Sequence, residues 1–409
     1  MTTRREPGIP VTRLRAARNA VSLVFVLNGF CFASWVSRVP DTRERLSLSN
    51  GQLGLLLLAL SMGSLLALPL TGAVIERVGA ARVVLLGVSV DVVGLFLVAL
   101  GASVLESPWP AAAGLFLYGM GTGTWDVAMN VEGAAVEHEL ARAIMPRFHA
   151  AFSLGTVLGA GLGVVAAGLH LPMTWHLGGV GVVAALVVVP AVRSFLPRDR
   201  EAGEEPPERL SALSAWKEPR TLMIGLMVLA LALTEGAAND WLALALVDGY
   251  DVAHWVGVAG FALFVSAMTA GRLWGSALLD RHGRVAVLWS TMVAAAAGLV
   301  LIVFGGHPAV AAVGIVLWGL GASLGFPVGM SAAADDPRRA AARVSVVSTI
   351  GYTAFLAGPP LLGFLAEEVG TLRALLVVVL LLVPSALVVP AARESRGPAA
   401  RQRSAGIKD

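Results

Sequence analysis

Long apolar segments alternate with short polar segments along almost the whole chain. A helix needs about 20 mostly apolar residues to cross the hydrocarbon core of a bilayer, and twelve segments of the chain meet this length. We predict spanning helices at 19–38, 51–74, 82–102, 110–133, 147–168, 172–192, 220–246, 254–279, 284–305, 308–333, 343–366 and 370–391. The pattern therefore predicts an all-α integral membrane protein.

The longest polar segment divides these spans six and six. We expect a tail at 1–18, a six-helix half at 19–192, a linker at 193–219, a second half at 220–391 and a tail at 392–409. Arginines concentrate in the tails, the linker and every second loop. Because cytosolic loops of membrane proteins are enriched in Lys and Arg, we predict that both termini are cytosolic. The arginine- and alanine-rich composition favours a bacterial cell membrane.

The composition excludes several classes of protein. Hydrophobic residues make up 56% of the 409 residues and charged residues 14%, whereas soluble domains carry about 25% charge; a water-soluble enzyme and a disordered chain are both excluded. The single cysteine, Cys31, rules out a disulfide framework. No GxxxxGK[ST] loop, HExxH motif or dense histidine cluster is present. We expect no cofactor, no metal and, with arginines spread thinly between apolar runs, no nucleic-acid partner.

Two short turns at equivalent places in the two predicted halves share one pattern. Each follows the second span of its half and reads acid, arginine, any residue, glycine. Glycine permits the positive φ that a tight turn between helices needs, and a carboxylate can pair with arginine or a helix N-terminus. We predict that these turns form a conformational switch, made of Glu76, Arg77, Gly79, Asp280, Arg281 and Gly283.

The repeated turns and several span motifs resemble the major facilitator superfamily. The resemblance covers about residues 18–392. The motifs Asn28-Gly29-Phe30, Trp125-Asp126-Val-Ala-Met-Asn130 and Gly325-Phe326-Pro327 resemble the fucose–galactose–glucose:proton symporters. Met129-Asn130-Val-Glu132-Gly133 and Arg147-Phe148-His149 more closely resemble the MosC-like branch of the superfamily. The resemblance implies two pseudo-symmetric six-helix halves with a cavity lined by helices one, four, seven and ten. One departure is Trp35-Val36-Ser37-Arg38, where the sugar symporters carry an acid late in helix one.

Polar residues inside the predicted cavity helices are the candidates for function. A charge in hydrocarbon is costly, so such residues are functional candidates by default. We predict proton coupling at Asp126 and Glu235. Predicted solute-binding residues are Asn28, Trp35, Asn130, Asn239, Trp241 and Phe326, and predicted gate residues are Arg38, Asp240, Glu132 and Arg147. We expect Arg38 to pair with Glu235 or Asp240 across the two halves when the outer side of the transporter is closed.

These observations favour a secondary transporter of a small polar solute, such as a sugar, polyol or related amine. We expect it to be a monomer, coupled to protons and working by alternating access between its halves. A proton-antiport exporter of a drug or metabolite is the alternative within transport, and a non-transporting membrane sensor is a further alternative. No convergent catalytic constellation indicates an enzyme. Glycines at Gly159, Gly161 and Gly163 favour close helix packing over nucleotide binding.

Overall fold

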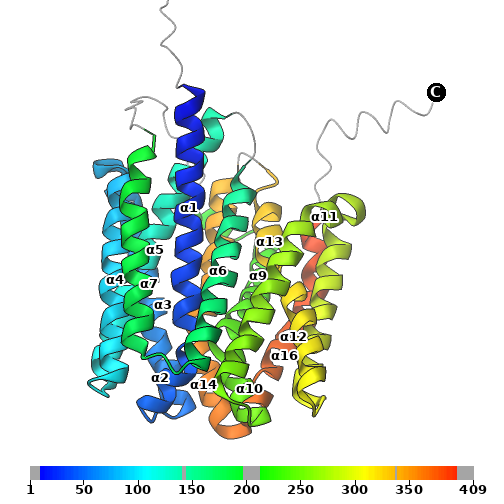
Figure 1. The fold of residues 1–409 in the computed structure, drawn as a ribbon. Helices are drawn as coiled ribbons and strands as arrows, with labels where there is room; N and C mark the ends of the chain where they lie inside the picture. The colour runs from blue at the N-terminus through cyan, green and yellow to red at the C-terminus, as the bar shows by residue number, and fades with distance from the viewer. Residues whose placement is uncertain (1–9, 141–143, 197–211, 337–338, 394–409) are drawn as a thin grey trace, which may run out of the picture. The chain divides into compact units, whose positions relative to one another are not determined.

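The protein is described by a computed structural model covering residues 10–140, 144–196, 212–336 and 339–393 (Figure 1). Most of the predicted linker and parts of both predicted tails lie outside these residues. Every secondary-structure element in the described ranges is a helix, which confirms the all-α prediction.

Helices up to the linker correspond to the first six predicted spans. They are α1 (Val11–Val36), α2 (Val39–Arg45), α3 (Asn50–Val78), α4 (Ala80–Ser103), α5 (Pro108–Glu139), α6 (Met145–Gly168), α7 (Met173–Ala191) and the 3₁₀ helix η1 (Val192–Ser194). The short helix α2 follows α1 directly and was not predicted as a separate element.

Helices after the linker correspond to the last six predicted spans. They are α8 (Ala212–Ala215), α9 (Pro219–Ala237), the π-helix η2 (Ala238–Leu242), α10 (Ala243–Tyr250), α11 (His254–Phe304), α12 (Pro308–Ala322), α13 (Gly325–Ala333), α14 (Ala340–Val369), α15 (Thr371–Ala374), α16 (Leu376–Val388) and η3 (Val389–Ala392). The two predicted spans within 254–305 form one element, α11, with a kink at Gly283.

Within the described residues, eleven helical segments are long and apolar enough to cross a membrane. The chain is therefore a multi-pass membrane protein. The helix α5, which covers the predicted span 110–133, is not among the eleven although it has 32 residues. Its glycines, threonines and the polar residues Asp126, Asn130 and Glu132 make it the most polar of the predicted spans.

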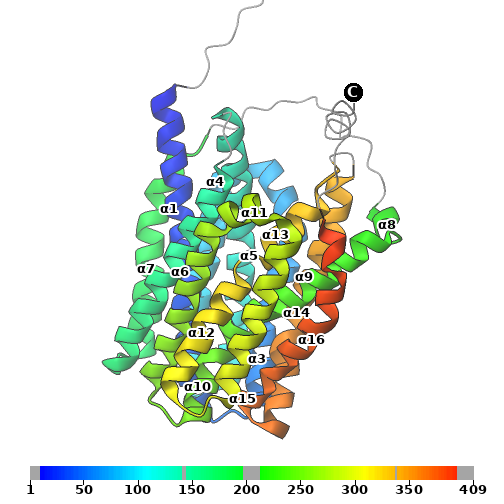
Figure 2. The same cartoon turned by 90° about the vertical axis from the view of Figure 1, so that its right-hand side faces the viewer.

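The chain forms two compact units, and their boundaries cross the predicted halves. The first unit comprises Met1–Gly203, Ala237–Thr269 and Pro359–Ala374, and the second comprises Glu204–Gly236, Ala270–Gly358 and Leu375–Asp409. In the first unit, α5 packs against α3 and α4, and α1 packs against α6 and α7; Figure 2 shows α1, α6 and α7 from a second side. In the second unit, the Trp318 indole N–H of α12 donates to the Thr234 carbonyl of α9 at 3.1 Å.

Glycines let several of these helices approach closely. A Cβ at Gly155 or Gly159 of α6 would lie against carbonyl oxygens of α1. A Cβ at Gly163 would meet the Ser37 side chain, whereas Gly161 has open space around it. The predicted packing role is therefore confirmed for Gly159 and Gly163 but not for Gly161.

The repeated turns have the same backbone conformation in both copies. Gly79 has φ 86° and ψ 154° between α3 and α4, and Gly283 has φ 76° and ψ 162° within α11. Side chains disfavour this positive-φ region strongly. The predicted reason for glycine at both positions is confirmed.

Candidate functional site

Asp126 and Asn130 lie one turn apart on α5, as their spacing predicts. The Asn130 side-chain amide donates to the Asp126 backbone carbonyl at 2.8 Å and to Asp126 Oδ1 at 3.2 Å. Both side chains are half-buried. Among the described residues, no basic side chain lies within ion-pair distance of Asp126. Protonation of this carboxyl group would therefore remove a charge that no ion pair balances.

Glu235 of α9 forms an ion pair with Arg272 of α11 in the second unit. Arg272 Nη2 lies 3.0 Å from both Glu235 carboxylate oxygens, and Arg272 Nε donates to the Ser323 carbonyl at 3.3 Å. Ser323 lies at the break between α12 and α13. The sequence analysis missed Arg272, although an arginine inside the predicted span 254–279 was the signal that could have identified it.

Three aromatic rings, those of Phe326, Tyr352 and Phe355, form a row that ends near the Glu235–Arg272 ion pair. The Phe326 ring of α13 lies 6.3 Å from the Tyr352 ring of α14, and Tyr352 lies 6.4 Å from Phe355, measured between ring centroids. A Cβ on Gly236, the residue after Glu235, would lie 3.2 Å from Phe355 Cδ1. The second unit thus places a charged pair and aromatic rings side by side.

The other predicted solute-binding residues lie in the first unit. Asn28 and Trp35 of α1 are buried. Asn239 and Asp240 are half-buried in η2, and Trp241 is buried there with its indole N–H unpartnered among the described residues. Single π-helical turns inside α-helices are frequent at functional sites, so the η2 geometry adds weight to the three residues that the sequence singled out.

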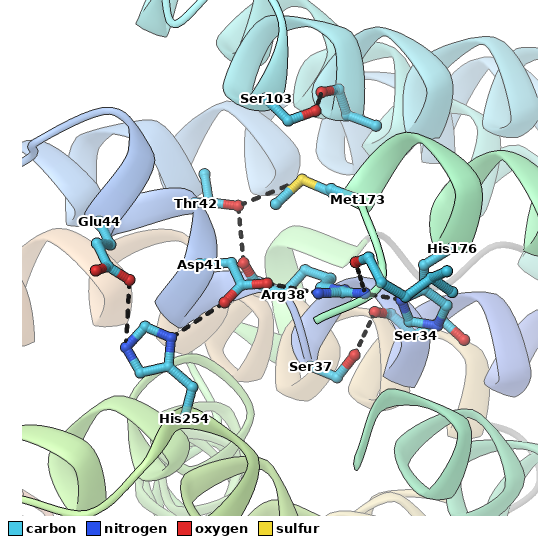
Figure 3. A network of polar contacts seen from close by, with 12 residues as sticks. Ser34, Ser37, Arg38, Asp41, Thr42, Glu44, Ser103, Met173, His176 and His254 are labelled. Atoms are coloured by element: carbon cyan, nitrogen blue, oxygen red, sulfur yellow. Dashed lines mark hydrogen bonds and ion pairs between the residues drawn. The ribbon is translucent and has the colours of Figure 1, made fainter. Parts of the chain in front are cut away.

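Arg38 has different partners from those expected. Its side chain is 2% exposed and forms an ion pair with Asp41 at 2.5 Å, donates from Nε to His176 Nδ1 at 2.9 Å and from Nη2 to the Leu171 carbonyl at 2.8 Å (Figure 3). The pair expected with Glu235 or Asp240 in the outward-closed state stays a prediction. The short helix α2 brings Asp41 within reach three residues after Arg38, which satisfies the guanidinium locally.

Further charged contacts join α2 to segments beyond the linker within the first unit. Asp41 also contacts His254 of α11 at 3.1 Å, and Glu44 contacts the same imidazole at 3.5 Å (Figure 3). We call this group the α2 cluster, together with the Arg43–Asp248 pair, whose two N···O distances are both 2.6 Å. The sequence analysis did not identify these residues.

Glu132 and Arg147, two of the predicted gate residues, form no ion pair with each other among the described residues. The buried Glu132 carboxylate accepts the Leu196 backbone N–H at 2.6 Å, whereas Arg147 is exposed near the start of α6. Glu137 accepts the N–H groups of Ile144 and Met145 at the same helix start. At the start of α6, Glu137 thus binds backbone amides that lack a partner within the helix.

The switch residues of the repeated turns are exposed: Glu76, Arg77, Asp280 and Arg281. The ion pair next to the second turn is Arg284 with Asp335 at 2.6 Å, and Arg220 of α9 contacts the same carboxylate at 2.8 Å. Partial burial acts to raise the pKa of Asp335, but hydrogen bonds from Arg284 and Arg220 outweigh it and hold the pKa below its usual range. The sequence analysis did not identify Asp335.

Comparisons with known proteins agree on one family. The profile of the Major Facilitator Superfamily matches residues 21–352 and 250–408. An uncharacterised MFS-type transporter of Yersinia pestis is 33% identical over 88% of this chain and 90% of its own length. The membrane protein MosC of Rhizobium meliloti is 30% identical over 88% and 86%.

Solved structures share the fold at low identity. A variant of the nucleoside transporter NupG has a TM-score of 0.75 and 15% identity over 92% of this chain and 99% of its own. The fucose:proton symporter FucP of E. coli has a TM-score of 0.63 and 14% identity over 94% and 99%.

Proposed function

The chain belongs to the major facilitator superfamily, and on this premise we propose that it couples the transport of a small polar solute to the movement of protons. It is a membrane transporter and not an enzyme. We propose a sugar, polyol or related amine as the solute, and alternating access between the two predicted halves as the mechanism.

The observation that carries the proton coupling is Asp126. Its carboxyl group lies on a membrane helix without a cation partner in the described chain, and the Asn130 amide donates to it. A proton bound there neutralises the carboxyl group. When the conformation changes and water leaves the group, the neutral form costs less free energy to desolvate than the charged form. The two hydrogen bonds to Asp126 use the Asn130 amide nitrogen, so its carbonyl oxygen is the group left to accept a solute hydroxyl.

The second unit supports a solute that has both polar groups and an apolar face. Glu235 and Arg272 offer planar groups that can hydrogen-bond hydroxyls, and the row from Phe326 to Phe355 offers aromatic faces. NupG carries nucleosides and FucP carries fucose with protons, and both are solutes of this kind. The bacterial relatives support a location in a bacterial cell membrane. In the proposed orientation, both termini are cytosolic and the α2 cluster lies at the outer end of the transporter.

The experiment is uptake into proteoliposomes under an imposed pH gradient, with a panel of sugars, polyols, nucleosides and amines. We expect one class to accumulate against its gradient. Asp126→Asn, which imitates the protonated residue, should retain solute binding and the exchange of labelled for unlabelled solute. It should lose uphill accumulation, because no proton can be released.

Glu235→Gln is the matched comparison, since Glu235 is the other acid among the predicted coupling sites. We expect this change to weaken binding, because it removes the partner of Arg272, while residual uptake still responds to the pH gradient. Accumulation that persists in Asp126→Asn and disappears in Glu235→Gln would assign the coupling to α9. A chain that carries no member of the panel under any gradient would contradict the proposed solute class.

A further inference from the structure

We propose that His254 is a regulatory proton-binding site, separate from the coupling carboxyl groups, whose protonation fastens α2 to the start of α11. The site lies entirely within the first unit, and it does not depend on which solute is carried. The two acids of the site precede the linker in sequence, and His254 follows it. Protonation of this imidazole would therefore strengthen the contact between α2 and α11.

The geometry places the imidazole between two carboxylates of one short helix. His254 Nδ1 lies 3.1 Å from Asp41 Oδ1, and His254 Nε2 lies 3.5 Å from Glu44 Oε2 (Figure 3). The side chain of His254 is 31% exposed, so that protons can reach it from water. Neutral imidazole carries one N–H and can donate to only one of these acids, whereas the imidazolium donates from both nitrogens.

Each element that contacts this site contributes charges. From α2 come Asp41, Glu44 and Arg43, and Arg43 is itself held by Asp248 of α10. Arg38, the residue directly before α2, shares the Asp41 carboxylate and is bound on its other side by His176 of α7. Asp251 lies in the loop between α10 and α11, three residues before His254. The end of α6 lies next to Trp255 at Gly168, whereas the titratable residues of α6, Arg147 and His149, lie near its start.

His254 is the member of this group that changes charge near neutral pH. Unperturbed imidazole titrates between about pH 5 and 8, whereas carboxylates and guanidinium groups keep their charge there. The Arg43–Asp248 pair therefore contributes equally at each pH in this range. In His176, Nδ1 accepts a hydrogen bond from Arg38, which makes it the unprotonated nitrogen, and this ring is buried.

The direction of the effect follows from these charges. At low pH the imidazolium attracts Asp41 and Glu44, and the contact between α2 and α11 is strongest. As the pH rises through the titration of His254, the attraction is lost, and the segments separate more readily. The proton thus acts as a ligand of the fastened state and shifts the population towards it.

Distances between spin labels on Arg45→Cys and Ala253→Cys test the proposal in purified protein. Both sites are exposed, and the single native cysteine, Cys31, is buried, so that labels attach at the introduced sites. When the pH is lowered from about 8.5 to about 5.5, we expect the ratio of the short-distance to the long-distance population to rise about fivefold. A change of this size corresponds to the free energy that two partly exposed ion contacts contribute.

Two substitutions of His254 and one control make the outcome decisive. His254→Gln should show the long-distance population of alkaline protein at both pH values, and His254→Lys the short-distance population at both. The control is His170→Asn, because His170 is exposed, has φ 52°, and asparagine tolerates that conformation; it should keep the full response. A His254→Gln protein that keeps the fivefold response, or a His254→Lys protein that still responds, would overturn the proposal.

Discussion

Asp335 binds two arginines that come from different helices. The carboxylate accepts from Arg284 of α11 and from Arg220 at the start of α9, and its side chain is 9% exposed. It thereby joins three segments of the second unit next to the second repeated turn. An acid held in this way is stabilised in its ionised form, which links the stability of this unit to pH.

Asp335→Asn tests this link. The folded pKa is lower than the unfolded pKa, so the stabilisation is fully present above the unfolded value of about 3.9 and is lost as the pH falls through the folded value. We expect the substitution to lower stability by about 1–2 kcal/mol at pH 7, and the difference from wild type to shrink as the pH falls below about 4.

Thermal unfolding in detergent across pH measures this difference. Asp280→Asn is the matched control, because Asp280 is exposed and its stability effect should be near zero at every pH. An Asp335→Asn protein that loses equal stability at pH 7 and at acid pH would show that volume or geometry, rather than charge, explains the role of Asp335.

At the scale of elements, helix contacts in the first unit depend on particular glycines. In α6, a Cβ at Gly155 would collide with the Val26 carbonyl oxygen of α1, so that the two backbones can approach only where the side chain is absent. Gly161 lies further along α6 with nothing within 4 Å of such a Cβ. The two glycines therefore have different reasons to be present.

Gly155→Ala and Gly161→Ala form a matched pair on one helix. Gly155→Ala should force α1 and α6 apart and destabilise the protein by about 1–3 kcal/mol. Gly161→Ala should be neutral or stabilising by up to about 1 kcal/mol, because alanine favours the helix. Melting temperatures in detergent measure both, and equal effects of the two changes would contradict the contact that the structure shows.

At the scale of the whole molecule, we predict that the repeated turns set the balance between conformations rather than bind solute. Glu76, Arg77, Asp280 and Arg281 are exposed beside two turns of matching backbone geometry. Asp280→Asn should reduce transport at least severalfold, because it biases one conformation, while equilibrium solute affinity stays within a few-fold.

Binding and uptake of a solute identified in the panel measure the two effects separately. Glu76→Gln, the corresponding change in the first copy, should produce the same separation of transport from binding. Loss of equilibrium binding in a folded Asp280→Asn protein would assign this turn to the solute site and contradict its role as a switch.

The order of residues alone determined the helical class, the approximate spans, the positive-φ glycines at Gly79 and Gly283, and the family. These features depend on local hydrophobicity, on backbone sterics and on short motifs, all of which can be read along the chain. The proximity of Asp126 and Asn130 belongs to the same group, because their spacing on one helix fixes it.

Only the tertiary structure decided which charges meet. Arg38 pairs with Asp41, Glu235 pairs with Arg272, and His254 lies between two acids of α2. Ion pairs form over a few ångströms, so they depend on the depth, rotation and ends of each helix. Hydropathy leaves these quantities undetermined, and packing between helices fixes them.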